Sequence, residues 1–585
     1  MKINKFRSTL LASVATATFA LTSTNVSARP EGAIALPSAP AIENMQEVQF
    51  VGRDELMSYQ DIGDFEFLYE PEYISALVQE GKLPPIWERL PKRPLVFNGD
   101  AMPDGIGRYG GTFRHTIGGR PEGWNWTASQ HQGWGGINYT VQECLTRNGP
   151  MVRLKAEDSY PLPNLATDWE WDGNKLTMNL IDGAKWSDGD PFDAEDVRFW
   201  WEDNVLDENV PTRMNATTMG EGTSLEVLSP TQIRWTFPQE EPKLVLHSMA
   251  YINGCPGPSH LLKEHHPKYG GTSYDDYVQA FPAGRLPWVS MGAWTAVEYK
   301  QDEVVILRRN PYYWKVDPDG RQLPYIDRIT FDIYDLETIN IKAINGEIGM
   351  QGRHLTFQNY PIFMANQERG GYQLRHWIDG GDGTTAVVFN LNHKDPVLRS
   401  IFNKRDFRIA MSLAIDRNAI REAAFLGVGE SRQISPPPIS TYHVPEHAYA
   451  YLEFDPEKSN RLLDDIGLAQ RNQRGIRLRP DGKPIEINIE TSSTMLGAGK
   501  MFEMIAANWR SMGIDAKVKT QARQLYAQRR NALLCDVLVW GGAGEIIPTL
   551  DPRWFLPYSA SSFHALDFAR WYRSCLLYTS DAADE

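Results

Sequence analysis

Residues 175–201 read KLTMNLIDGAKWSDGDPFDAEDVRFWW and contain the signals of a strand, a turn and the start of a helix. Leu176, Met178 and Leu180 alternate with polar residues, which predicts a strand with one buried face. The Asp-Gly and Ser-Asp-Gly steps that follow are turn sequences. The helix is therefore expected only after these turns.

The helix is predicted to begin immediately after Asp193. The carboxylate of Asp193 can accept hydrogen bonds from the first free amides, and Asp196 three residues later completes a capping-box pattern. Apolar residues then follow at spacings of i, i+3 and i+4, namely Val197, Trp200 and Trp201. Since these three share one helix face, we expect them to pack in a core.

The run GAKWSDGDPFDAEDV at residues 183–197 resembles the signature of the family 5 solute-binding proteins of ABC importers, which include the periplasmic oligopeptide- and dipeptide-binding proteins. It is long and chemically mixed, unlike a lone glycine motif. The resemblance implies an α/β fold with two lobes, that of a type II periplasmic binding protein of the large cluster with an extra subdomain and a discontinuous first lobe. It assigns structural roles to Asp188 and Asp196.

Further landmarks of the same family lie along the chain. Four short sequences resemble them: LATDW at residues 165–169, MGAW at 291–294, RNPYYW at 309–314 and GEI at 346–348. The resemblance thus extends from about residue 109 to about residue 556. The following division of the chain is implied: a signal peptide at 1–28, an N-terminal arm at 29–107, lobe I at 108–146, its small subdomain at 147–222, lobe I again at 223–296, lobe II at 297–574 and a non-native tail at 575–585.

The first 28 residues fit a secretory signal. Lys2, Lys5 and Arg7 precede an uncharged run, and the Val-Ser-Ala sequence that ends at Ala28 fits a cleavage site. No cysteine lies near this site, which argues against a lipid anchor, and no later stretch reaches the roughly 18 apolar residues needed to span a membrane. We expect a periplasmic protein that begins at Arg29.

The end of the chain, CLLYTSDAADE at residues 575–585, resembles a translated sequencing adapter. The family's final segment, which completes the first lobe, is expected beyond residue 574. Leaving out residues 1–28 and 575–585 takes the basic residues from 59 to 56 and the acidic residues from 74 to 71, so the net charge stays at −15. An acidic surface excludes a nucleic-acid partner, because such binding needs clustered Lys and Arg.

The second half of the chain alternates between predicted helices and strands. Helices are predicted at 406–420, 456–466 and 501–512, and strands at 485–490 and 515–519. This alternation is typical of β-α-β units.

Three tryptophans, Trp124, Trp126 and Trp134, lie among glycines and polar residues in an irregular segment. They either pack the first lobe or line a cleft, where tryptophan faces suit sugar rings or bulky side chains. Both interpretations remain open from sequence.

A strand that starts at Asp536 and includes Trp540 runs into a glycine-rich turn at residues 541–545, where a backbone can approach a ligand closely. In the peptide-binding relatives, an aspartate beyond this strand holds the ammonium group of the peptide. Glu545 stands at the corresponding position and is one methylene longer, so it is either such a contact or a turn carboxylate satisfied within the protein. The candidate ligand-binding residues are Glu545, Gly541, Gly542, Trp540, Trp124, Trp126 and Trp134.

Without Cys575, the cysteines are Cys144, Cys255 and Cys535. They are too scattered for a zinc motif, and at most one disulfide can form among three. Three separate buried thiols is the interpretation favoured here over one disulfide.

The resemblance predicts the solute-binding component of an ABC importer, a monomer without cofactor or metal that closes two lobes around a solute and docks on the membrane permease. A peptide is the first expectation for the solute. An oligosaccharide is the alternative, because 18 tryptophans suit sugar rings. A secreted glycoside-acting enzyme is a third, weaker reading, since the chain contains no G-x-S-x-G, H-E-x-x-H or P-loop motif.

Overall fold

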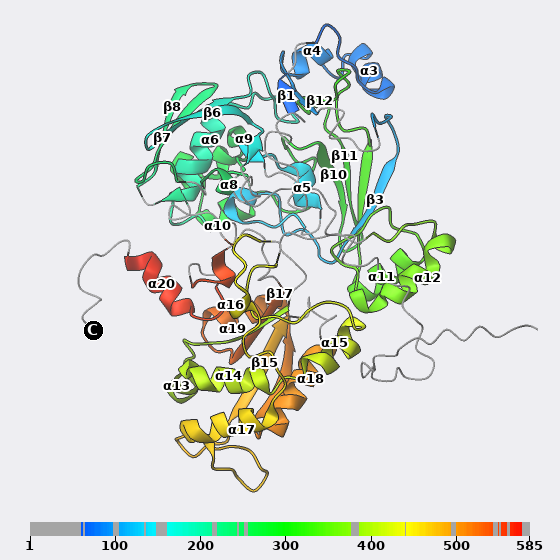
Figure 1. Ribbon diagram of the computed structural model, residues 1–585. Coiled ribbons are helices and arrows are strands. Elements are labelled where there is room, and N and C mark those ends of the chain that lie inside the picture. The colour runs from blue at the N-terminus through cyan, green and yellow to red at the C-terminus, as the bar shows by residue number, and fades with distance from the viewer. Residues whose placement is uncertain are drawn as a thin grey trace, which may run out of the picture.

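Sheet pairing divides the chain into two lobes, which lie above and below the middle of Figure 1. The upper lobe contains the sheets built from residues 112–333, and the lower lobe contains the sheet built from residues 385–541. The computed structural model describes residues 60–62, 65–97, 105–133, 136–147, 161–212, 219–220, 222–242, 245–250, 255–375, 385–438, 440–492, 499–541, 548, 552–557 and 562–575. The two-lobed α/β fold predicted from the sequence is confirmed.

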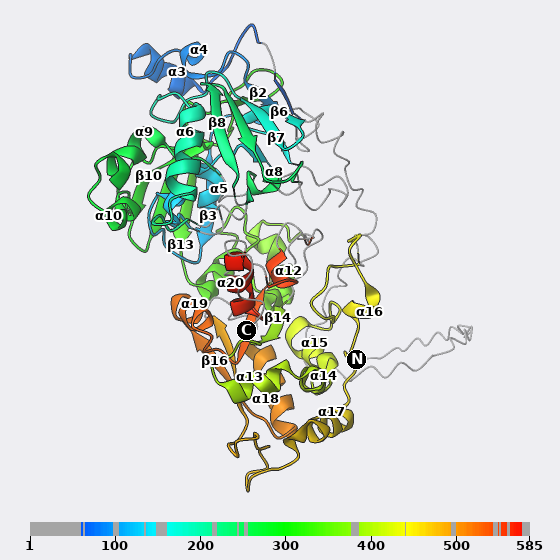
Figure 2. The same ribbon diagram turned by 90° about the vertical axis from the view of Figure 1, so that its left-hand side faces the viewer.

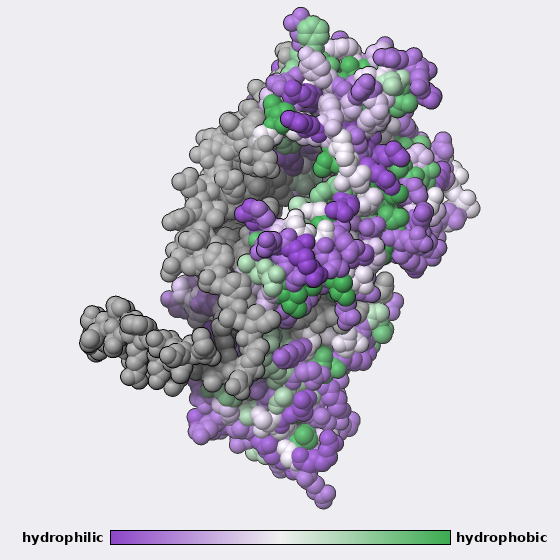
Figure 3. Space-filling view, turned by 90° about the vertical axis from the view of Figure 1, so that its right-hand side faces the viewer, coloured by the Kyte–Doolittle hydropathy of each residue, from purple (hydrophilic) through white to green (hydrophobic). Residues whose placement is uncertain are grey.

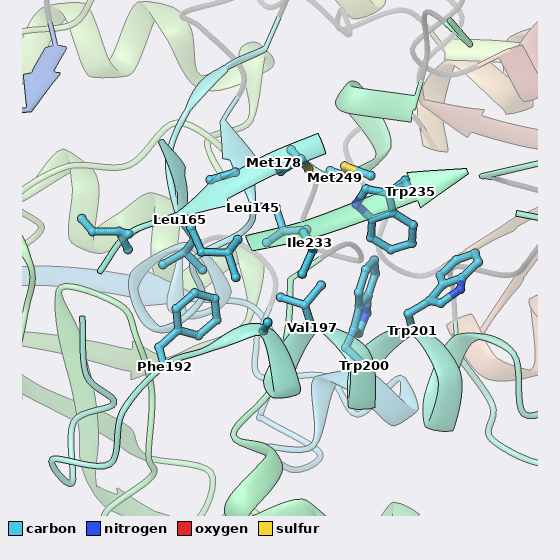
Figure 4. Close-up of a cluster of buried hydrophobic side chains, with 14 of the residues drawn as sticks. Leu145, Leu165, Met178, Phe192, Val197, Trp200, Trp201, Ile233, Trp235 and Met249 are labelled. Atoms are coloured by element: carbon cyan, nitrogen blue, oxygen red, sulfur yellow. The ribbon is translucent and has the colours of Figure 1, made fainter. Parts of the chain in front are cut away.

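The strand, turn and helix start of the opening stretch form as predicted. Strand β7 (Lys175–Leu180) buries its alternate apolar residues, and helix α6 (Ala194–Arg198) begins after Asp193. Asp193 and Asp196 cap each other's backbone in a capping box. The helix continues as a π-helical segment, η4 (Phe199–Val205), and its apolar face points at the neighbouring sheet in Figure 4.

A four-stranded antiparallel sheet surrounds β7. Its order is β6 (Ala166–Asp172), β7, β9 (Gln232–Thr236) and β8 (Ser224–Ser229). The sheet therefore continues to Thr236. The boundary predicted at residue 222, with a return to the first lobe from 223, falls between β7 and β8 of this sheet.

The second large sheet of the upper lobe brings together distant parts of the sequence. Its order is β10 (Trp294–Lys300), β11 (Val304–Arg309), β13 (Arg328–Ile333) and β3 (Thr112–Ile117). Strands β3 and β13 are parallel and the others antiparallel. Strands β11 and β13 lie wholly beyond residue 297, where lobe II was predicted to begin, and β10 crosses that position. They stay in the upper lobe because β13 pairs along the whole of β3.

The N-terminal arm adds a small sheet to the upper lobe. Strands β1 (Gln60–Ile62) and β2 (Leu95–Phe97) pair with each other, and β2 also pairs with β12 (Lys315–Val316). Helices α3 (Glu72–Gln79) and α4 (Ile86–Arg89) lie at the outer end of the upper lobe in both ribbon views, away from the lower lobe (Figure 2).

The lower lobe is built on a mixed sheet with the order β14 (Thr385–Phe389), β17 (Val537–Gly541), β15 (Glu486–Ser492) and β16 (Asp515–Gln521). Strand β14 is antiparallel to β17, whereas β15, β16 and β17 run parallel. Helices α13 (Pro396–Asn403), α14 (Arg405–Leu413), α17 (Pro456–Leu463), α18 (Gly499–Ser511) and α19 (Arg523–Asn531) complete the β-α-β pattern predicted for this half.

The remaining α-helices, together with the short helix η2, are shorter or lie at the edges of the lobes. They are η2 (Trp126–Ala128), α5 (Ile137–Val141), α8 (Val245–Ser248), α9 (Ser259–Leu262), α10 (Tyr274–Gln279), α11 (Leu336–Ile344), α12 (Tyr360–Gly370), α15 (Arg417–Phe425), α16 (Pro445–Ala448) and α20 (Leu566–Cys575).

The helix predicted at residues 406–420 is divided into two helices. Helix α14 ends at Leu413, and Asp416 then caps α15 by accepting a hydrogen bond from the amide of Ala419 at 2.9 Å. The periodicity of the sequence concealed this break, because both helices pack apolar residues in the same core.

Cys144 and Cys255 form a disulfide, which corrects the expectation of three separate thiols. Cys535 is a free, buried cysteine, as expected.

Candidate functional site

The carboxyl ends of three parallel strands meet at one edge of the lower sheet, and in parallel sheets ligands bind outside this edge. The first residue of β14, Thr385, pairs with the last residue of β17, Gly541. The edge therefore lies where the chain enters the lower lobe from the upper one. Figure 1 accordingly shows β17 at the end of the lower sheet nearest the upper lobe.

Trp540 stands at this edge within a stack of aromatic rings. Its ring lies 5.7 Å from that of Tyr526 at an interplanar angle of 18°, and 6.3 Å from that of Phe563 at 28°. Phe563 in turn stacks on Trp554 at 4.9 Å and 8°. Trp540 is half-buried and the other three rings are buried, so Trp540 is the member of the stack with surface to offer a ligand.

The sequence did not single out Tyr526, Phe563 or Trp554 as partners of Trp540. The available signal was the density of aromatic residues at 554–563. A stack of this kind holds the indole plane in one orientation, which favours recognition of a flat, partly apolar ligand face.

A buried ion pair lies in the same part of the lower lobe. The guanidinium of Arg529 donates to both carboxylate oxygens of Glu490 at 2.7 Å, and Gln521 also donates to Glu490. The hydrogen bond to Glu490 raises the pKa of Arg529. Burial, with the negative charge of Glu490 added, raises the pKa of the neighbouring Cys535 thiol well above its usual value. The charges of Glu490 and Arg529 are paired with each other, and Cys535 stays protonated and unreactive.

The upper lobe faces the lower one through the segment that follows β3. Strand β3 begins near the arm, where Gly110 donates its amide to the Tyr325 carbonyl, and it ends at Ile117; the amide of the next residue, Gly118, donates to the His354 ring. His354 belongs to the segment that connects the lobes. In that segment the side-chain amide of Gln351 donates to the carbonyl of Thr116 in β3, whereas that of Gln358 donates to the Ala424 carbonyl of the lower lobe at 2.8 Å.

Trp124 packs the upper lobe. It is fully buried, its indole N–H donates to the Ala283 carbonyl at 3.0 Å, and its ring stacks on Trp288 at 6.4 Å. Trp124 has no surface to offer a solute in this structure, so the packing interpretation applies to it. Trp126 contacts Trp288 edge-on at 5.5 Å and donates to the Cys255 carbonyl, but it remains half-buried.

Trp540 and Gly541 lie at the carboxyl edge of the lower lobe's sheet, whereas Trp126 lies in the upper lobe. The other predicted ligand contacts, Trp134, Gly542 and Glu545, fall outside the described residues. The segments that the structure describes hold no group of three or more His, Cys, Asp or Glu side chains arranged to bind a metal ion.

The acidic residues of the opening stretch are engaged within the upper lobe. The carboxylate of Asp196 is nearly fully buried and accepts hydrogen bonds from the Ser259 amide at 2.9 Å and the Trp186 indole at 3.0 Å. Burial raises the pKa of Asp196 to about 6, although these hydrogen bonds oppose the shift. Asp188 pairs with His260 at 2.8 Å. Both aspartates thus have internal partners, in agreement with the structural roles predicted for them.

Within the described part of the chain, no helix is long and apolar enough to cross a membrane. The described residues on the face shown in Figure 3 are mostly hydrophilic, with hydrophobic residues in small separate patches.

Comparison with known proteins identifies the family. The model of the bacterial extracellular solute-binding proteins, family 5, middle region, matches residues 161–565, which is more than half of the chain. The chain belongs to this family.

One relative within family 5 is the periplasmic alpha-galactoside-binding protein of Rhizobium meliloti strain 1021. It is 41% identical over 467 residues, which cover 77% of this chain and 66% of that protein. The chain therefore spans 66% of the length of this relative.

Two solved structures are also similar. The periplasmic binding protein MelB of Agrobacterium fabrum C58, determined in complex with stachyose, has a TM-score of 0.77 and 31% identity and covers 91% of this chain and 84% of its own. An oligopeptide-binding protein, OppA, has a TM-score of 0.58 and 30% identity, with 89% and 82% covered. Both support the two-lobed fold.

Proposed function

We propose that this protein is the periplasmic solute-binding component of an ABC importer and that its solute is an oligosaccharide with α-galactosyl units. The observation that carries the proposal is the 41% identity to a periplasmic alpha-galactoside-binding protein. The similarity to a binding protein solved with stachyose, a neutral tetrasaccharide with α-galactosyl units, agrees with it. The oligosaccharide alternative considered from the sequence thus takes precedence over a peptide.

The carboxyl edge of the lower lobe's sheet has the chemistry that an oligosaccharide needs. One face of a pyranose ring carries C–H groups and packs on aromatic rings, whereas its hydroxyl groups need hydrogen-bonding partners. Trp540 offers a ring held in place by Tyr526 and Phe563. The nearby charges of Glu490 and Arg529 are paired with each other, which suits a neutral ligand.

In this proposal the protein has no catalytic role. It would close its lobes on the saccharide and then present the closed form to the permease. Calorimetry with stachyose should therefore show saturable binding. The solution should contain no released monosaccharide afterwards.

Calorimetric titration with stachyose, raffinose and a mixture of tri- to pentapeptides tests the proposal. We expect stachyose or raffinose to bind at micromolar affinity or tighter, which corresponds to about 8 kcal/mol, and the peptides to give no heat. Peptide binding without saccharide binding would establish the second candidate, peptide uptake, which the similarity to OppA favours. Hydrolysis of either ligand would establish an enzyme.

A further inference from the structure

The two lobes have separate hydrophobic cores. The buried apolar clusters of the upper lobe, with the side chains packed against them, draw on residues 65–333, and those of the lower lobe draw on residues 386–563. Among the described residues, no such cluster includes side chains of both lobes. The position of one lobe relative to the other therefore depends on the segment that connects them and on the contacts of that segment.

The connecting segment that follows α11 is fastened to the upper lobe. Asn340 of α11 is buried, and its side-chain oxygen accepts hydrogen bonds from the Thr356 amide at 2.9 Å and from the Asn359 side chain at 3.2 Å. Its side-chain nitrogen donates to the carbonyl of His354 at 3.0 Å. One buried side chain thus holds residues 354–359 against the upper lobe.

Gln358 lies within this fastened stretch and contacts the lower lobe. It is the middle residue of the short helix η7 (Phe357–Asn359), which runs directly into α12. Its side-chain amide donates to the carbonyl of Ala424 at 2.8 Å. Of the hydrogen bonds and ion pairs that join two described residues, this one alone connects the lobes. The upper lobe therefore presents a fixed donor to the lower lobe at this point.

The acceptor belongs to the core of the lower lobe. Ala424 is buried in the last turn of α15 and packs in the same apolar cluster as residues of α14, α17 and α18. In Figure 1, α15 lies on the side of the lower lobe that faces α11 and α12. The last carbonyls of a helix have no partner within it and form the negative end of its dipole. A neutral or cationic donor is thus favoured here, whereas a carboxylate is not.

We propose that Gln358 is a positioning residue for lobe closure, whose hydrogen bond to Ala424 is kept while the lobes turn toward each other and holds the two halves of the solute site in register. This inference rests on the proposed function, in which the lobes close on a saccharide. A contact beside the connecting segment moves little when the lobes rotate, so one hydrogen bond can serve the open and the closed form. Without it the lobes sample more orientations, and fixing them weakens solute binding.

The test compares two substitutions of similar length. Gln358→Glu introduces a carboxylate, which cannot donate to the Ala424 carbonyl, whereas Gln358→Lys keeps a donor and adds a charge that suits the helix end. By calorimetry, we expect Gln358→Glu to lower stachyose affinity about three- to tenfold and Gln358→Lys to stay within twofold of the wild type. The matched control, Gln473→Glu, adds the same charge at an exposed turn of the lower lobe and should leave the affinity unchanged.

Small-angle X-ray scattering of the ligand-free proteins gives a second measurement, which does not depend on the solute. We expect a larger radius of gyration for Gln358→Glu than for the wild type and Gln358→Lys. The melting temperature should stay unchanged, because the hydrogen bond belongs to neither core. Gln358→Leu removes the donor without adding a charge and should behave as Gln358→Glu does.

Three results would overturn the inference. They are an unchanged radius of gyration in both Gln358→Glu and Gln358→Leu, stachyose affinity within twofold of a wild type that binds it, and a lowered melting temperature, which would show a role in folding alone. Absence of any saccharide binding by the wild type would instead refute the proposed function, and the radius of gyration would then decide the inference by itself.

Discussion

The disulfide between Cys144 and Cys255 encloses all four strands of the β6-β7-β9-β8 sheet. The two cysteines are 111 residues apart, and the strands span residues 166–236 between them. The disulfide therefore joins the two ends of the segment that leaves the β3-β13 part of the upper lobe and returns to it.

Replacing both cysteines by serine should destabilise the upper lobe. A cross-link over about 111 residues restricts the unfolded chain strongly, so its loss should cost about 2–5 kcal/mol in the free energy of unfolding. Urea unfolding followed by tryptophan fluorescence measures this, with Cys535→Ser as the control that leaves the disulfide intact. An unchanged midpoint in the double variant would show that the disulfide adds no stability.

Asp196 should make the stability of the upper lobe depend on pH. Its pKa of about 6 in the folded protein exceeds the ordinary value of 3.8, so the folded state holds the proton over a range in which the unfolded chain has lost it. This contribution is fully present below about pH 4 and is lost as the pH rises through 6, by about 3 kcal/mol.

The difference in unfolding free energy between the wild type and Asp196→Asn isolates this effect, because the other groups titrate in both proteins. We expect the difference to move by about 3 kcal/mol in favour of the variant between pH 4 and pH 7. Parallel pH curves for the two proteins would contradict the assignment of the raised pKa to Asp196.

Local features of the fold could be predicted from the sequence. The capping box of Asp193 and Asp196 lies within four residues, and the alternation of Leu176, Met178 and Leu180 reports directly on one face of a strand. Each depends on near neighbours alone. The two-lobed architecture followed from the resemblance that these motifs carry.

Pairings between distant residues could not be predicted in the same way. Strand β13 pairs with β3 over a separation of more than 200 residues, and nothing in either strand specifies its partner. The lobe boundary predicted at 297 was placed without knowledge of this pairing. The disulfide and the burial of Trp124 likewise depend on which distant segments meet.

Trp540 should contribute to saccharide binding through its exposed part. Trp540→Leu removes the aromatic face but keeps an apolar residue beside Tyr526 and Phe563. Because an aromatic contact contributes about 0.5–1.5 kcal/mol beyond its area, stachyose affinity should fall about three- to tenfold. Trp571→Leu, on the exposed face of α20, is the matched control and should leave the affinity unchanged. Equal affinities in both variants would remove Trp540 from the site.

Glu545 distinguishes the two candidate solutes. In a peptide-binding protein, a carboxylate at this position would hold the ammonium group of the peptide, and Glu545→Gln would remove a charge-assisted hydrogen bond of about 1.5–3 kcal/mol. Peptide affinity would then fall about ten- to a hundredfold. A neutral saccharide has no ammonium group, so the proposed function predicts stachyose affinity within twofold of the wild type. Calorimetry on a folded Glu545→Gln variant measures both, and a large loss of stachyose binding would show that this carboxylate accepts hydrogen bonds from the sugar.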